Sequence, residues 1–101
     1  MTLLLDQAHF DMMTGADRAL QREVVGLFRG QAEQWRAQLF ITVETWREAA
    51  HTAKGSARGI GLGRLAEACD AAEHGPVNCA EAALARVREA LDEALAALST
   101  Y

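Results

Sequence analysis

Apolar residues recur every three or four positions along almost the whole chain of 101 residues, which is the period of an amphipathic α-helix. The chain also holds 21 alanines, but only eight glycines and one proline, and this balance favours helix. A β-branched and aromatic run at 40–43 resembles a strand fragment, yet the sequence offers no second run to pair with it. The sequence therefore predicts an all-α fold.

The apolar pattern divides into one short and four longer helical segments. We expect helices over residues 6–13, 14–39, 43–60, 63–73 and 78–98. Asp6, Thr14 and Thr42 are the predicted N-caps of the first three, and the Gly75-Pro76 pair breaks the chain before the last. The second helix is predicted to bury one stripe, composed of Leu20, Val24, Leu27, Phe28, Trp35 and Leu39.

Short links between long amphipathic helices indicate that consecutive helices run antiparallel. We therefore expect an up-down-up-down four-helix bundle with the short N-terminal helix packed on it, as a single domain over residues 1–101. The third helix is expected to bury a seam of mostly small residues, namely Val43, Trp46, Ala50, Ala53, Ala57 and Ile60.

Charge and hydropathy argue against several functional classes. The net charge of −4 gives no basic footprint, so we expect no nucleic-acid partner. No apolar run approaches the roughly 18 residues of a membrane-spanning helix, and the N-terminus lacks the basic start of a signal peptide. Two cysteines do not make a disulfide framework. We expect a cytoplasmic protein, not bound to a membrane, and a monomer.

The spacing of Cys69, His74 and Cys79 invites a zinc interpretation. It does not match the ligand pairs of common structural zinc sites, and a fourth ligand is missing. Cys69 also falls on the apolar side of its predicted helix, where a free cysteine behaves as a small hydrophobe. We therefore expect no metal site and no cofactor in this chain.

Glycines at 55, 59, 61 and 63 crowd into nine residues of a predicted helical stretch. Each glycine inside a helix costs about 0.5–1 kcal/mol relative to alanine, so something must require the missing side chains. With the alanine seam buried, the third helix turns a different stripe toward solvent, made of Arg47, His51, Lys54, Gly55 and Arg58. This pattern predicts an exposed imidazole in a positive local field, beside a bare surface.

That stripe suits phosphoryl chemistry with a protein partner. The ordinary pKa of histidine is about 6.5, so a neutral imidazole is a competent nucleophile at pH 7. Lys54 is placed to neutralise charge on a phosphoryl group, and Gly55 to leave room for the partner's backbone.

The segment His51-Thr52-Ala53-Lys54-Gly55-Ser56-Ala57, followed by Gly61, Leu65, Cys69 and Glu73, resembles the pattern of histidine-containing phosphotransfer (HPt) domains. The similarity extends back to the Asp6–Gly15 opening and to Phe28, and so covers most of the chain. Ala57 departs from the serine of many members; because it lies on the buried seam, we expect that change to affect packing.

The resemblance implies a phosphocarrier and not a self-sufficient enzyme. His51 would accept a phosphoryl group from an aspartyl phosphate in a receiver domain and pass it to another receiver. Lys54 would be its charge partner, Gly55 the clearance for docking, and Ser56 an orienting or solvating group. Further partner contacts are expected from Arg47, Arg58 and Gly59. The Mg²⁺ used in transfer would sit in the receiver, and this chain would bind no ATP.

Two other functions remain open at this point. The histidine could be the substrate of a histidine kinase's ATP domain, as in the N-terminal modules of chemotaxis kinases. The chain could also be a docking adaptor that never carries phosphate.

Overall fold

The computed structural model describes residues 3–101, and over that range the chain forms helices and no strand. The elements are α1 (Gln7–Thr14), α2 (Arg18–Gln38), α3 (Trp46–Ile60), α4 (Gly63–His74), a short 3₁₀ turn η1 (Val77–Cys79) and α5 (Ala80–Ala97). The all-α prediction is confirmed. The first two residues of the predicted domain lie outside the described residues.

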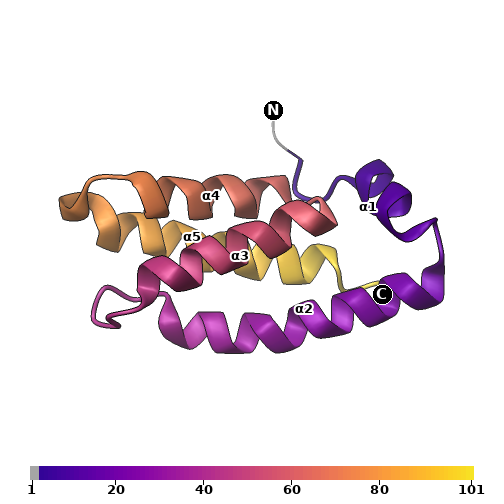
Figure 1. Ribbon diagram of the computed structural model, residues 1–101, viewed down its shortest axis with the longest axis horizontal. Helices are drawn as coiled ribbons and strands as arrows, with labels where there is room; N and C mark the ends of the chain where they lie inside the picture. The colour runs from indigo at the N-terminus through magenta and orange to yellow at the C-terminus, as the bar shows by residue number, and fades with distance from the viewer. Residues whose placement is uncertain (1–2) are drawn as a thin grey trace.

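Helices α2 to α5 form an elongated bundle in which successive helices run in opposite directions (Figure 1). α3 packs against α2 and α4, and α5 packs against α4 and α2, so the four helices close a ring. α1 lies across one end of this bundle, where it contacts α2 and α3. Within the described part of the chain, every helix is too short or too polar to cross a membrane.

The first two helices begin at aspartate caps. Asp6 accepts a hydrogen bond from the backbone N–H of His9 at 3.1 Å, as predicted. The second cap is Asp17, which accepts from Leu20 at 3.1 Å, and the prediction of Thr14 was wrong. Gly15 adopts a left-handed conformation that ends α1, so Thr14 is the last residue of that helix and its hydroxyl donates back to the Phe10 carbonyl.

The link before α3 is longer than predicted, and Thr42 does not cap that helix. Two successive turns connect α2 to α3: the Val43 N–H donates to the Phe40 carbonyl, and the Trp46 N–H donates to the Val43 carbonyl. These turns delay α3 until Trp46, where Thr45 takes the cap position without a side-chain hydrogen bond.

The buried face of α2 confirms Phe28, Trp35 and Leu39 of the predicted stripe but not Leu20 and Leu27, which are 40% and 72% exposed. The other buried residues of this face are Gln21, Val25 and Ala32. The reason is a buried polar residue. Gln21 is fully covered because its amide donates to the Asp11 carboxylate at 2.7 Å and to the Thr14 hydroxyl at 3.0 Å. A hydropathy pattern assigns that position to the surface.

The predicted alanine seam of α3 is confirmed. Ala50, Ala53 and Ala57 are buried against the core, whereas Val43 and Trp46 at the start of the seam are only partly covered. Small side chains let two helices approach closely, because interaxial distance depends on the residues at the contact. The seam therefore brings α3 near α4, and side chains on these two helices meet.

Gly61 ends α3 where the chain before α1 crosses over it. Its φ of +99° lies in the left-handed region, and its carbonyl accepts from the Asp6 N–H at 2.8 Å. A Cβ at this position would lie 3.0 Å from the Asp6 carbonyl oxygen. Gly61 therefore serves close packing against the chain before α1 and the turn into α4.

We expect Gly61→Ala to lower the free energy of unfolding by about 1–3 kcal/mol, because a non-glycine residue is strained at positive φ. Gly59→Ala is the matched control, since a Cβ there meets open space. That control should be neutral or stabilising by up to about 1 kcal/mol. Urea denaturation followed by circular dichroism measures both, and equal stabilities would contradict this role for Gly61.

Candidate functional site

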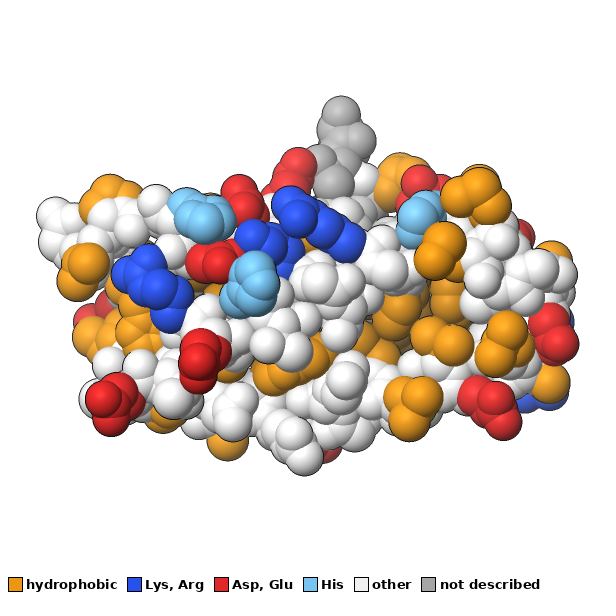
Figure 2. All heavy atoms as spheres, viewed as in Figure 1, with side chains coloured by type: hydrophobic (Ala, Val, Ile, Leu, Met, Phe, Trp, Pro, Cys, Tyr) orange, Lys and Arg blue, Asp and Glu red, His pale blue; other side chains and the backbone are white. Residues whose placement is uncertain are grey.

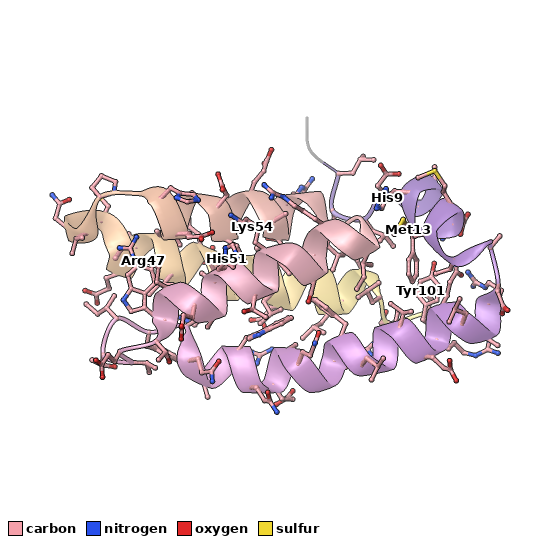
Figure 3. All side chains as sticks on the ribbon, in the orientation of Figure 1. His9, Met13, Arg47, His51, Lys54 and Tyr101 are labelled. Carbon is pink, nitrogen blue, oxygen red and sulfur yellow. The ribbon has the colours of Figure 1, made fainter. Side chains whose placement is uncertain are left out.

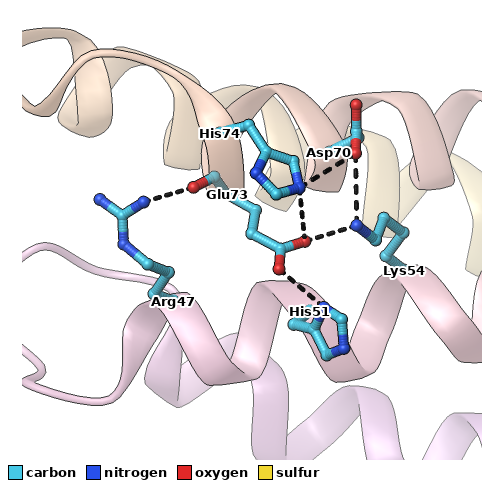
Figure 4. A network of polar contacts seen from close by, with 6 residues as sticks. All are labelled: Arg47, His51, Lys54, Asp70, Glu73 and His74. Atoms are coloured by element: carbon cyan, nitrogen blue, oxygen red, sulfur yellow. Dashed lines mark hydrogen bonds and ion pairs between the residues drawn. The ribbon is translucent and has the colours of Figure 1, made fainter.

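His51 projects outward from the middle of α3 (Figure 3), and its side chain is 68% exposed. Its Nδ1 lies 2.7 Å from Glu73 Oε2 on α4 (Figure 4). An ionised carboxylate only accepts hydrogen bonds, so Nδ1 is the nitrogen that carries the proton. The lone pair of the neutral ring is then on Nε2.

Lys54 does not face solvent, and that part of the prediction was wrong. It is only 7% exposed, because its side chain turns toward α4. Its ammonium donates to Glu73 Oε1 at 2.6 Å and to Asp70 Oδ1 at 3.2 Å (Figure 4). A helical wheel of α3 does not contain these acceptors, which follow Lys54 by 16 and 19 residues. The field around His51 is therefore a balanced ionic network and not a cationic patch.

Glu73 connects the two functional residues of α3. The hydrogen bond from Lys54 is the main cause that lowers the pKa of Glu73, and the hydrogen bond with His51 acts in the same direction. The hydrogen bond with Glu73 is likewise the main cause that raises the pKa of Lys54. Both groups are thus charged at neutral pH, and Glu73 presents a carboxylate to the imidazole. Sequence analysis assigned Glu73 no role, although the residue belongs to the HPt pattern.

Arg47 binds the end of α4 instead of lying free. Its guanidinium donates to the backbone carbonyl of Glu73 and stacks over the Trp46 ring, 4.7 Å from the centroid. The bond satisfies a carbonyl in the last turn of α4, where a cation is favoured. Arg58, two turns beyond His51, is exposed.

The surface beside His51 is bare along one stripe of α3. A Cβ added at Gly55 or Gly59 would meet no atom within 4 Å, so the packing of the chain itself does not require these glycines. Ser56, between them, is partly buried, and its hydroxyl donates to Gln31 Oε1 on α2 at 3.5 Å. The hydrogen bond found for Ser56 in the described chain thus leads away from His51.

An apolar groove of about 350 Å³ begins where this stripe meets α1 and α2. Ser56 and Gly59 form part of its wall, and the rest is mainly apolar: Phe10, Met13, Val24, Leu27, Phe28 and Ile60. Leu27 and Met13 are 72% and 59% exposed. Figure 2 shows hydrophobic side chains gathered on the part of this face formed by α1, α2 and α3, to the right of the charged cluster. A sequence pattern that places Leu27 in the core misses this groove.

Cys69, His74 and Cys79 do not form a zinc site. Cys69 is buried in the hydrophobic core, whereas the other two side chains are exposed. Burial raises the pKa of the Cys69 thiol to about 12, and zinc binds the thiolate.

Replacing Glu73 with glutamine tests the ionic network. A carboxyl with a lowered folded-state pKa stabilises the fold above its unfolded-state pKa, and this contribution is lost as the pH falls through the folded-state value. We expect Glu73→Gln to have a lower free energy of unfolding than wild type at pH 7. This difference in stability should shrink as the pH falls below 4.5, the ordinary pKa of a glutamate. Urea denaturation across pH measures this gap. Glu23→Gln, at an exposed position of α2, is the control, and a gap that does not change with pH would contradict the assignment.

The comparisons with known proteins agree with this geometry. The family model of the Hpt domain matches residues 11–99. The chain is also similar to the crystal structure of the histidine phosphotransferase ShpA from Caulobacter crescentus, with 38% sequence identity and a TM-score of 0.85. That match covers 98% of this chain and 90% of ShpA. No curated protein matches the sequence.

The family match spans most of the described helices, and His51 stands on α3 with its ring held by α4. The fold, the exposed histidine and the sequence pattern thus lead to one family, whose members are phosphocarrier intermediates of phosphorelay signalling. The chain belongs to the Hpt domain family.

Proposed function

We propose that this chain accepts a phosphoryl group on Nε2 of His51 from the aspartyl phosphate of one receiver domain and passes it to a second receiver. The observation that carries the proposal is the bond between Glu73 and Nδ1 of an otherwise exposed ring. This bond fixes the imidazole through Nδ1 and leaves the nucleophilic Nε2 on the opposite side of the ring. The function rests on this geometry together with membership of the family.

The transfer balances between the imidazole and the leaving aspartate. The Nε2 lone pair attacks phosphorus, the bond from phosphorus to the aspartyl oxygen breaks, and the aspartate leaves as a carboxylate. The ring thereby gains positive charge, and the Nδ1 proton stays shared with Glu73, which stabilises that charge. Lys54 supports the step by holding Glu73 in place through the 2.6 Å ion pair. The expected Mg²⁺ belongs to the receiver, which positions the transferred group.

A receiver would dock over the bare stripe at Gly55 and Gly59 and cover the adjoining apolar groove. Exposed apolar side chains such as Leu27 and Met13 lose contact with water in such a complex, which favours association. Arg58 lies on the same face and could pair with acidic groups of the partner. Both cysteines are free thiols, which supports transfer in the reducing cytoplasm.

Phosphoramidate, a small phosphodonor to histidine, tests the acceptor directly. Intact-mass spectrometry should show one phosphoryl adduct on wild type, labile to acid and stable to base, and none on His51→Gln. The fold should survive this change because the side chain is exposed. His74→Gln, at another exposed histidine, is the control and should keep the adduct. An adduct on His51→Gln would remove His51 as the acceptor.

The source of the phosphoryl group distinguishes the relay from the kinase-substrate and adaptor functions. Labelling by a phosphorylated receiver in the absence of ATP supports the relay, whereas labelling that requires ATP and a kinase domain supports the kinase-substrate function. Receiver binding without any transfer from wild type, unchanged in His51→Gln, would support the adaptor.

Gly55→Leu tests the docking face. The added side chain points into open space in the free protein, so helicity should be kept or slightly raised, while receiver affinity should fall at least about tenfold. Gly26→Leu is the matched control, because that glycine is also open but does not line the groove. Calorimetric titration with a receiver measures the affinity, and equal affinities would place the interface elsewhere.

A further inference from the structure

Three potential metal ligands converge at the C-terminal end of α4. Asp70, Glu73 and His74 share one face of the helix, at relative positions i, i+3 and i+4. One ligand atom from each lies within 4.8 Å of the others. His74 Nε2 is 3.6 Å from Asp70 Oδ1 and 3.6 Å from Glu73 Oε1 (Figure 4). One imidazole nitrogen and two carboxylate oxygens make a mixed donor set that suits zinc.

Two of the three ligand-atom spacings match a tetrahedral ion, and the third lies within 4.8 Å. Zinc binds imidazole nitrogen and carboxylate oxygen at about 2.0–2.2 Å, which places neighbouring ligand atoms roughly 3.3–3.6 Å apart. Both distances from the His74 nitrogen reach this range without any movement of the helix. Both contacts are longer than hydrogen bonds and leave the ring nitrogen within ion-pair distance of both carboxylates.

The two carboxylate oxygens of this cluster, Asp70 Oδ1 and Glu73 Oε1, already bind a positive charge. The Lys54 ammonium lies 2.6 Å from Glu73 Oε1 and 3.2 Å from Asp70 Oδ1. A divalent ion at this place would replace one charge by two and would also engage the ring nitrogen of His74. The displaced ammonium sits on a flexible four-carbon stem and can turn toward solvent.

We propose that Asp70, Glu73 and His74 bind Zn²⁺ in exchange for the Lys54 ammonium, and that the ion blocks phosphoryl acceptance. Zinc takes Oε1 of Glu73, whose other oxygen fixes His51, and places two positive charges beside the ring. The ion draws the negative charge of the carboxylate away from Nδ1, so positive charge that develops on the ring is less well stabilised. The inhibition rests on the proposed function, whereas the binding does not.

Titration calorimetry with ZnCl₂ tests the binding in a tag-free protein that carries Cys79→Ser, which removes the exposed thiol. We expect one ion per chain, and an affinity at least about tenfold weaker in His74→Ala and in Asp70→Asn. The His74 side chain is exposed and that of Asp70 is about half exposed, so these variants should fold. The absence of saturable binding, or equal affinity in His74→Ala, would overturn the site.

Two further variants decide where the ion sits. Lys54→Met removes the competing charge and keeps an apolar side chain of similar length, so it should bind zinc more tightly. Weaker binding in this variant would contradict the exchange. His51→Gln should bind as the parent does, because His51 is not among the ligands. Loss of binding in His51→Gln would place the ion on the acceptor histidine and overturn the proposal.

Phosphoramidate labelling with and without zinc tests the regulation. Saturating zinc should abolish the adduct on the Cys79→Ser protein and leave labelling of His74→Ala unchanged at the same concentration. Full labelling of the zinc-loaded protein would contradict the inhibition and leave the binding result standing. A protein that binds zinc but takes no label even without the ion would instead count against the proposed function.

Discussion

The carboxylate of Glu73 joins the two helices on which the site depends, because one oxygen contacts His51 and the other contacts Lys54. It performs both tasks only if α3 and α4 lie close enough for these side chains to meet. The buried alanines of α3 create that proximity. Arg47 reinforces it by binding the backbone carbonyl of Glu73 itself. The core packing and the chemistry of the imidazole are therefore consequences of the same helix contact.

Around this network the surface separates into a polar part and an apolar part. The ionised groups hold the ring from the α4 side, and the bare glycines and the groove lie toward α1 and α2. An incoming partner can thus contact apolar surface without disturbing the residues that orient the histidine. A cation, in contrast, would enter through the polar part and compete for the carboxylates.

Much of this molecule follows from residue spacing. The number and order of the helices, the cap at Asp6 and the buried seam of α3 were all predicted from local pattern. The errors came where a distant residue decides the outcome. Thr14 turned out to be the end of α1, and in α2 Gln21 is buried whereas Leu27 is exposed. Gln21 can be buried only because Asp11 and Thr14 satisfy its amide, and a hydropathy pattern contains no such information.

The sequence by itself determined the helical bundle, the exposure of His51 and the bare surface at Gly55, because each depends on periodicity along one helix. Only the tertiary structure decided what the ring of His51 contacts and where Lys54 points. The acceptors of both residues stand on α4, 16 to 22 residues further along the chain. A long cationic side chain turns toward the carboxylates that the fold brings within reach. The direction of Lys54 therefore depends on how α3 packs against α4 and cannot be read from a helical wheel of α3 alone.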